Sequence, residues 1–332
     1  MQGYTPAIIL ISGFLFDLIL GDPNYRYHPV RVIGRLTDLL HNWFKGRPMN
    51  MRFSGVLLAL LTILISVSAY FIIIILLNLA HPILAMLMNI YFVYSLIALK
   101  DLFNHCGPVI EALRSNGLIK ARESVSMIVG RDVNSLDENG VIRSAIETLA
   151  ENFVDGFLSP VFWFCIGSII GPMIDVEPVL SGVVFLIIFK VASTLDSMVG
   201  HKTEELIEIG WAGARLDDLL NFIPARLSLI LLFFGAMLSG LRPLSGLTTA
   251  MRDRLKHDSP NSAHPESFVA GAIRRRLGGP VRYPEGLKEK PWLGAEFPDP
   301  ELKDIRGVIR LLMITALLVL FLSSFVIILR LS

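Results

Sequence analysis

Residues 53–77 read FSGVLLALLTILISVSAYFIIIILL, a run without a single charged side chain. A helix needs roughly 20 apolar residues to cross the hydrocarbon core of a bilayer, and this run is long enough. A second apolar run, Pro82–Leu99, begins after a short turn and is closed by Lys100 and Asp101. The two runs therefore predict a hairpin of membrane-spanning helices.

Apolar runs continue on both sides of this hairpin. Leu311–Leu329 lies between Arg310 and Arg330 and predicts a further span. Four other runs are less regular: Thr5–Leu20 contains an aspartate, Phe157–Ile174 and Pro178–Phe189 contain Gly and Pro, and Leu227–Leu241 is short for a full crossing. We expect the runs with Gly and Pro to form broken or re-entrant helices.

The composition agrees with a membrane protein. Of the 332 residues 53% are hydrophobic, and the mean hydropathy is +0.60, which is too apolar for an ordinary soluble protein. We predict an all-α, polytopic protein of the cell membrane, a single domain over residues 1–332 in contact with lipid. The net charge of +1 gives no general attraction for nucleic acid, so we expect no such partner. The two cysteines, Cys106 and Cys165, fit no metal spacing and predict packing residues.

The N-terminal run suggests no cleaved signal peptide. It lacks a cationic region before its apolar part, and Asp17 interrupts it.

Three polar segments, 21–52, 100–155 and 242–306, separate the apolar runs, and we expect all three in the cytoplasm. The Lys/Arg content of the first and third places them there, while 100–155 is mixed in charge and helical in pattern. If every apolar run crossed the membrane, segments 21–52 and 242–306 would lie on opposite sides. At least one run must therefore not cross, and we favour Leu227–Leu241 or one half of residues 157–189.

An acidic helical motif precedes one of these runs. Residues 147–155 read ETLAENFVD and place Glu147, Glu151, Asn152 and Asp155 on adjoining helical turns. Acids at the entrance of a membrane segment are unfavourable unless they pair or bind a cation. A solvated helix face would explain Glu147 easily, but it explains the others less well. Because Mg²⁺ prefers hard oxygen ligands, the motif predicts a magnesium site.

A second motif, RLDDLLNFIPAR over residues 215–226, contains Asp217, Asp218 and Asn221 between Arg215 and Arg226. Two adjacent acids with an amide and flanking arginines suit a complex of magnesium and phosphate. A helix end with ion pairs at the membrane interface is an equally good interpretation of this motif alone.

Weaker motifs add polar residues at helix ends and turns. Each also has a plain structural interpretation, as a capped turn, a helix junction or a surface charge. They contribute Asp22 and His28, Arg131 and Asp132, Asp196 and Lys202, Asn261, and the sequence Leu-Gly-Gly-Pro at 277–280.

Taken in order from Gly21 to Tyr283, these motifs resemble the CobD/CbiB family, which makes adenosylcobinamide phosphate in cobalamin synthesis. Two departures are Ser193, where the family usually has Asn, and Ser262-Ala263-His264, which replaces a small Ala-Gly pair. The resemblance implies ATP-dependent amide synthesis between adenosylcobyric acid and (R)-1-amino-2-propanol or its O-phosphate. It also implies Mg²⁺ as cofactor, an active site facing the cytoplasm, and other cobalamin-synthesis enzymes as candidate partners.

On this interpretation the residues fall into three roles. The expected catalytic residues are Glu151, Asp155 and Asp218. The expected metal ligands are Glu147, Glu151, Asp155, Asp217 and Asp218. The expected contacts to substrate or phosphate are Asp22, His28, Arg131, Asp132, Asn152, Asp196, Lys202, Arg215, Asn221, Arg226 and Asn261.

Two other functions compete with this one. Asp-Asp-x-x-Asn is similar to the aspartate-rich sites of membrane prenyltransferases, but those enzymes need more spanning helices around a lipid-sized cavity. A non-catalytic membrane sensor related to AmpE has no need for all the acid and arginine motifs at once.

Overall fold

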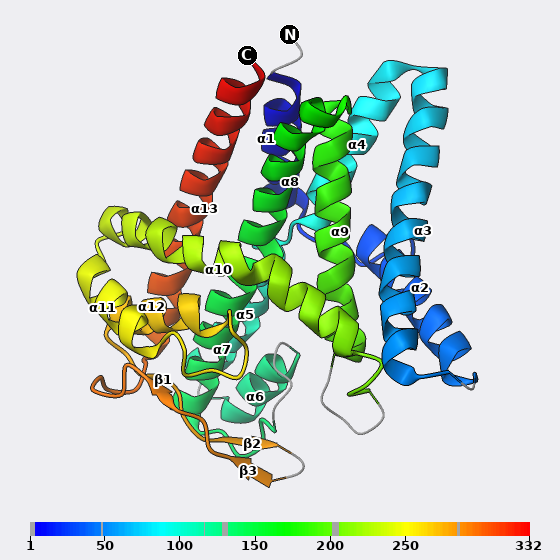
Figure 1. The fold of residues 1–332 in the computed structure, drawn as a ribbon. Helices are drawn as coiled ribbons and strands as arrows, with labels where there is room; N and C mark the ends of the chain where they lie inside the picture. Colours follow the sequence, from blue (N-terminus) through cyan, green and yellow to red (C-terminus); the bar gives the residue numbers. More distant parts are fainter. Residues whose placement is uncertain (1–3, 48, 116, 128–131, 201–205, 284–285) are drawn as a thin grey trace. The chain divides into compact units, whose positions relative to one another are not determined.

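The computed structural model describes residues 4–47, 49–115, 117–127, 132–200, 206–283 and 286–332. The described chain is almost entirely helical, with four short strands, and it divides into two compact units (Figure 1). Unit 1 consists of residues 1–98, 159–221 and 320–332, and unit 2 of residues 99–158 and 222–319. The division falls inside two helices, α10 (Trp211–Leu238) and α13 (Leu302–Leu331). Whether the chain acts as the single membrane domain expected over residues 1–332 stays a prediction.

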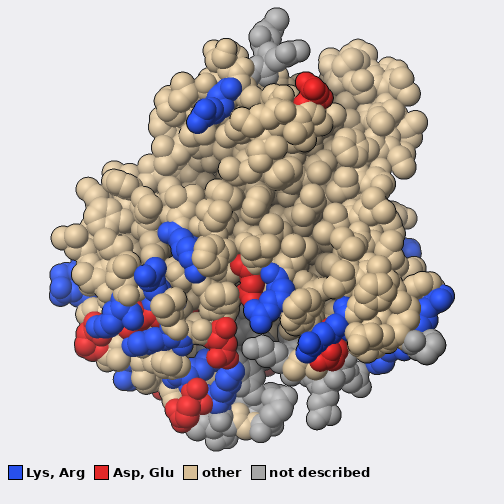
Figure 2. All heavy atoms as spheres, in the orientation of Figure 1, with Lys and Arg blue, Asp and Glu red and all other residues tan. Residues whose placement is uncertain are grey.

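Unit 1 is built from long apolar helices. Besides its parts of α10 and α13, it contains α1 (Thr5–Leu20), α2 (Pro29–Lys45), α3 (Met51–Ala80), α4 (Pro82–Leu96), α8 (Ser159–Ile170) with a 3₁₀ end (Gly171–Ile174), and α9 (Pro178–Val199). Only 17% of the apolar window of α3 is buried, so most of its apolar side chains face outward, as expected for lipid contact. Over most of α3 the surface in Figure 2 is uncharged.

Unit 2 combines helices with the strands. It contains α5 (Leu99–Arg114), α6 (Leu118–Ser126), α7 (Glu138–Phe153) with a π-helical turn (Val154–Leu158), α11 (Pro243–Asp253), α12 (Ala263–Ile273), β1 (Leu277–Gly278), β2 (Val281–Tyr283), β3 (Gly286–Lys288) and β4 (Trp292–Leu293). Strand β1 pairs antiparallel with β4, and β2 pairs with β3. Charged side chains of this unit gather over α11, α12 and the strands (Figure 2).

The predicted all-α, polytopic class is confirmed. Among the described residues, six helices are long and apolar enough to cross a membrane: Met51–Ala80, Pro82–Arg114, Glu138–Ile174, Pro178–Val199, Trp211–Leu238 and Leu302–Leu331. The predicted spans 53–77 and 311–329 lie inside two of them. Thr5–Leu20 forms α1 with the predicted bounds and is apolar but shorter. Cys106 and Cys165 are free and buried, as packing residues should be.

The runs expected to be broken differ from one another. Helix α9 is regular over its whole length, so Pro178–Phe189 contains no break. Its Gly182 serves packing instead, because an added Cβ would lie 2.4 Å from Ser168 Oγ on α8. Phe157–Ile174 does carry irregular turns, a π-helical one before Ser159 and a 3₁₀ one at its end. Pro160 explains the first, because it has no N–H to donate.

Helix α10 is much longer than the apolar run Leu227–Leu241 and continues through Pro224. In unit 2 its backbone approaches α13 closely, because a Cβ at Gly235 would lie 2.0 Å from Thr315 Oγ1. Figure 1 shows this half of α10 running across α13 rather than alongside it. Whether Leu227–Leu241 crosses the membrane stays a prediction.

Candidate functional site

The acidic motif of unit 2 faces two loops that are distant in sequence. Glu147 and Glu151 lie one turn apart on α7. The backbone N–H of Gly278 donates to Glu147 Oε1 at 2.6 Å, and Ser262 Oγ donates to Glu151 Oε1 at 2.7 Å. The acids therefore meet both the Leu-Gly-Gly-Pro loop and the loop that contains Ser-Pro-Asn.

The two glycines of the first loop are required by its shape. Gly278 and Gly279 have φ of 72° and 81°, which side chains rarely adopt. A Cβ at Gly278 would lie 2.6 Å from the carbonyl oxygen of Pro291, and one at Gly279 would lie 2.5 Å from the ring of Trp292. The pairing of β1 with β4 fixes this turn, so the Gly278 N–H is held toward Glu147.

The Ser-Pro-Asn loop is held by hydrogen bonds within the loop and by one from an arginine. Ser259 Oγ accepts from the backbone N–H groups of Asn261 at 3.2 Å and Ser262 at 3.4 Å. Asn261 Oδ1 accepts from Arg226 Nη1 at 3.2 Å, and the same nitrogen donates to the Phe222 carbonyl at 2.7 Å. Two predicted phosphate contacts, Arg226 and Asn261, are thus brought together in unit 2.

A histidine that the sequence analysis did not select lies in the same region. His257 Nδ1 accepts from the Ser259 N–H at 3.0 Å. Burial and the charge of Lys290 lower the pKa of His257, although the carboxylate of Glu151 acts against them. His257 is therefore a neutral imidazole within the electrostatic reach of the acidic motif.

In unit 1 the predicted residues Asp22 and His28 form a pair. His28 Nε2 lies 3.1 Å from Asp22 Oδ1, and the histidine is buried. Burial lowers the pKa of His28, because the opposing charge of Asp22 does not compensate for it. The segment is held on α4 by two hydroxyl contacts, Tyr25 with Tyr91 and Tyr94 Oη to the Gly21 carbonyl at 2.8 Å.

Of the second acidic motif, Asp217, Asp218 and Asn221 belong to unit 1, whereas Arg226 belongs to unit 2. Asn221 is buried, accepts from Ser159 Oγ at 2.6 Å and donates to Asp217 Oδ2 at 3.0 Å. Both the oxygen and the nitrogen of the Asn221 amide are therefore hydrogen-bonded, and the bond from the nitrogen orients Asp217. Arg215 lies 3.8 Å from Asp218, a weak ion pair that leaves the arginine exposed. A ligand-binding role for these residues stays a prediction.

The remaining predicted residues are placed individually. Asp132 accepts from the Asn134 N–H at 3.0 Å, which is a turn contact. Asn152 is exposed, whereas Asp155, in the π-helical turn, and Asp196, on α9, are partly buried. Arg131 and Lys202 lie outside the described residues.

The acidic motifs are chemically suited to magnesium. Among the described residues, no group of three or more His, Cys, Asp or Glu side chains is arranged to hold a metal alone. Mg²⁺ is usually bound by one or two carboxylates together with substrate phosphates and water. Glu147 and Glu151, one turn apart on α7, supply such hard oxygen donors, and Asp217 and Asp218 on α10 supply further carboxylates.

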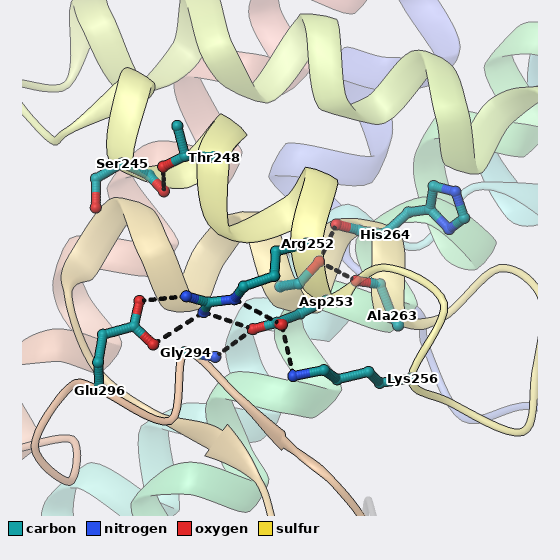
Figure 3. A network of polar contacts seen from close by, with 10 residues as sticks. Ser245, Thr248, Arg252, Asp253, Lys256, Ala263, His264, Gly294 and Glu296 are labelled. Carbon is teal, nitrogen blue, oxygen red and sulfur yellow. Dashed lines mark hydrogen bonds and ion pairs between the residues drawn. The ribbon is translucent and has the colours of Figure 1, made fainter.

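Sequence reasoning missed a buried polar network around Asp253 in unit 2 (Figure 3). Asp253 is fully buried and accepts from Arg252, the Gly294 N–H and Lys256, and Arg252 also binds Glu296. Burial alone would raise the pKa of Asp253, but these donors hold it far below its usual range. The run of charges at residues 252–258 was a signal for it, although such runs usually lie on a solvated face.

The chain is similar to one set of known proteins. The sequence model of the CobD/Cbib protein family matches residues 10–312. A cobalamin biosynthesis protein CobD of Pelobacter propionicus is 40% identical over 309 residues, which cover 93% of this chain and 91% of that protein. Proteins of the same description from Clostridium perfringens and Rhodobacter capsulatus are 36% and 38% identical, and each comparison covers at least 90% of both chains. No solved structure matches the chain.

Proposed function

Because the chain belongs to the CobD/CbiB family, we propose that it acts in cobalamin biosynthesis as an ATP-dependent acid–amine ligase. It joins the free propionate of adenosylcobyric acid to (R)-1-amino-2-propanol or its O-phosphate, giving adenosylcobinamide or its phosphate. The curated relatives, described as cobalamin biosynthesis proteins, support the pathway, and the chemistry of the polar motifs supports the reaction class.

One observation in unit 2 supports this proposal most strongly. The carboxylates of Glu147 and Glu151 meet two loops that the sequence places far away, and one of these loops also binds Arg226 through Asn261. Acids, backbone donors and an arginine in one place are the groups that phosphoryl and acyl transfer need.

The reaction divides into two steps with a balanced exchange of groups. The corrinoid carboxylate attacks the γ-phosphate of ATP, which forms an acyl phosphate and releases ADP. The neutral amine then attacks the acyl carbon, inorganic phosphate leaves, and the amine loses one proton. A carboxylate base is useful in this second step, and we assign it to Glu151, Asp155 or Asp218.

The other proposed roles are metal binding, phosphate binding and polar contact with the substrate. Glu147, Glu151, Asp155, Asp217 and Asp218 are the proposed ligands of Mg²⁺, which would stabilise the charge of the transferring phosphoryl group. Arg131, Lys202, Arg215 and Arg226 are the proposed phosphate contacts. Asp22, His28, Asp132, Asn152, Asp196, Asn221 and Asn261 are the proposed polar contacts to substrate.

The proposal is tested with purified protein in detergent or lipid. It should consume ATP only when the corrinoid acid is present, and mass spectrometry should find adenosylcobinamide or its phosphate according to the amine supplied. Product formed equally well without nucleotide would remove the acyl-phosphate mechanism. Folded protein that makes no product with either amine would favour the sensor function instead.

A further inference from the structure

Two arginines of unit 2, Arg226 and Arg254, have no acidic partner among the described residues. Several other cations of this unit are ion-paired: Arg143 and Arg276 with Asp299, Arg252 and Lys256 with Asp253, Arg275 with Glu301, and Lys288 with Asp258. Within the described residues, the Arg226 guanidinium donates only to the Phe222 carbonyl and the Asn261 amide oxygen. The Arg254 side chain makes no hydrogen bond or ion pair there, and its buried Nε has no acceptor.

A buried histidine lies beside these arginines without a partner for its ring. His264 is 0% exposed, and neither ring nitrogen has a hydrogen-bond partner among the described residues. Its backbone N–H donates to the carbonyl of Asn261, the residue whose side chain binds Arg226. In Figure 3 the ring points away from the network of Arg252 and Asp253. A buried polar group without a partner is unfavourable and rare, so its partner is expected to be a ligand or water.

The charges that act on His264 are positive. Burial and the charges of both Arg226 and Arg254 lower the pKa of His264 to about 4; the nearby Asn261 backbone acts against them, and no acid contributes. His264 is also in the first turn of α12, an 11-residue helix whose N-cap Ser262 makes no side-chain cap bond. The Ser262 hydroxyl donates to Glu151 instead. A helix N-terminus with arginines nearby favours an anion, although the backbone N–H groups of His264 and Glu266 are already bonded to the Asn261 and Ser262 carbonyls.

We propose that Arg226, Arg254 and His264 form a binding site for the phosphate group of a substrate. The arginines are partly exposed and accessible to an incoming anion, and the neutral His264 ring offers one N–H to a phosphate oxygen. The identity of the ligand rests on the proposed function, where the phosphate belongs either to the phosphorylated amine or to ATP. The existence of an anion site does not depend on that function.

Binding measurements test the site directly. Isothermal titration calorimetry in detergent would compare aminopropanol O-phosphate, aminopropanol and ATP on the full chain. Arg254→Gln should weaken the binding of one phosphate-bearing ligand about ten-fold or more, and His264→Phe should weaken the same ligand about three-fold. Arg306→Gln, which removes an exposed arginine of the same unit, is the control and should bind like the wild type.

The ligand whose affinity falls in the variants identifies the source of the phosphate. Weaker binding of aminopropanol O-phosphate alone, with unphosphorylated aminopropanol unchanged, assigns the site to the amine, and weaker binding of ATP alone assigns it to the nucleotide. Wild-type affinity for both ligands in Arg254→Gln would overturn the proposal, as would wild-type protein that binds neither ligand. If binding changes as expected but no amide forms, the ligase function fails while the anion site stands.

Discussion

Gly278 and Glu147 are separated by 131 residues in the chain, yet the backbone N–H of the first donates to the carboxylate of the second at 2.6 Å. This hydrogen bond joins the Leu-Gly-Gly-Pro loop to the acidic helix α7. It orients Glu147, and it also stabilises the negative charge of this buried carboxylate. The loop is therefore a part of the acidic site rather than a simple connection.

Gly278→Ala should disrupt this relationship. The new Cβ would lie 2.6 Å from the Pro291 carbonyl at a φ of 72°, so the loop must shift and the N–H moves away from Glu147. We expect amide synthesis to fall about ten-fold or more while the protein stays helical. Gly307→Ala is the control, because a Cβ there meets nothing within 4 Å, and it should keep full activity. Equal activity in both variants would show that the loop has no part in the site.

Charge removal tests the two acidic motifs. Glu151→Gln and Asp218→Asn keep the size of each side chain and remove its charge, so each should abolish magnesium-dependent product formation. Circular dichroism and gel filtration in detergent should be unchanged. Near-normal turnover in both variants would mean that the acids only form structural pairs.

Asp253→Asn should weaken unit 2. The buried carboxylate accepts from Arg252, Lys256 and the Gly294 N–H, and an amide cannot satisfy these donors. We expect a loss of about 2 kcal/mol of stability, seen as a lower melting temperature in detergent. Glu296→Gln removes an exposed partner of the same Arg252 and should lose under about 1 kcal/mol. A smaller effect at Asp253 than at Glu296 would contradict this ordering.

His264 should make stability depend on pH. Its pKa falls from 6.5 to about 4 on folding, so the unfolded chain binds more protons between these values. Stability is therefore complete above about pH 6.5 and declines as pH falls toward 4, by on the order of 3 kcal/mol. Thermal unfolding from pH 7.5 to 4 should show this slope, and His264→Phe should reduce it. A bound phosphate should reduce it as well, because an anion opposes the charges that depress the pKa.

The cytoplasmic placement of two polar segments can be tested by cysteine labelling. Cys106 and Cys165 are buried, so the native background is low. Arg47→Cys and Leu255→Cys introduce exposed thiols in segments 21–52 and 242–306, and an impermeant reagent added to intact cells should miss both. His81→Cys, in the turn between α3 and α4, should be labelled. Labelling of either polar segment from outside would overturn the topology.

The positions of helices could be predicted from the hydropathy of the sequence, but the packing of helices against one another could not. The charge-free run at 53–77 and the N-terminal run predicted α3 and α1, because the hydrocarbon core requires long apolar helices. Gly182, in contrast, looked like a helix breaker. The structure uses it for close contact between α8 and α9, a purpose that sequence spacing does not reveal.

Residues of the candidate site could be predicted only where they belong to a sequence motif. The acids of α7 were visible as a helical pattern, and Asn261 belonged to a recognisable turn. Their pairing with Gly278 and Arg226 depends on tertiary packing over long separations. Arg254 belongs to no motif, and His264 was noted only as part of a segment that departs from the family pattern. Both were selected from the structure because buried nitrogens of their side chains have no hydrogen-bond partner among the described residues.

Trp292 provides an optical reporter for the acidic site. It is the one tryptophan in the sequence of unit 2, since Trp43, Trp163 and Trp211 belong to unit 1. The guanidinium groups of Arg143 and Arg276 lie 4.8 and 4.4 Å from its ring centroid, and the same ring packs against Gly279. In a variant with the other three replaced by Phe, its fluorescence would follow movement of the loop that holds Glu147, so ligand binding could be watched in real time without a label.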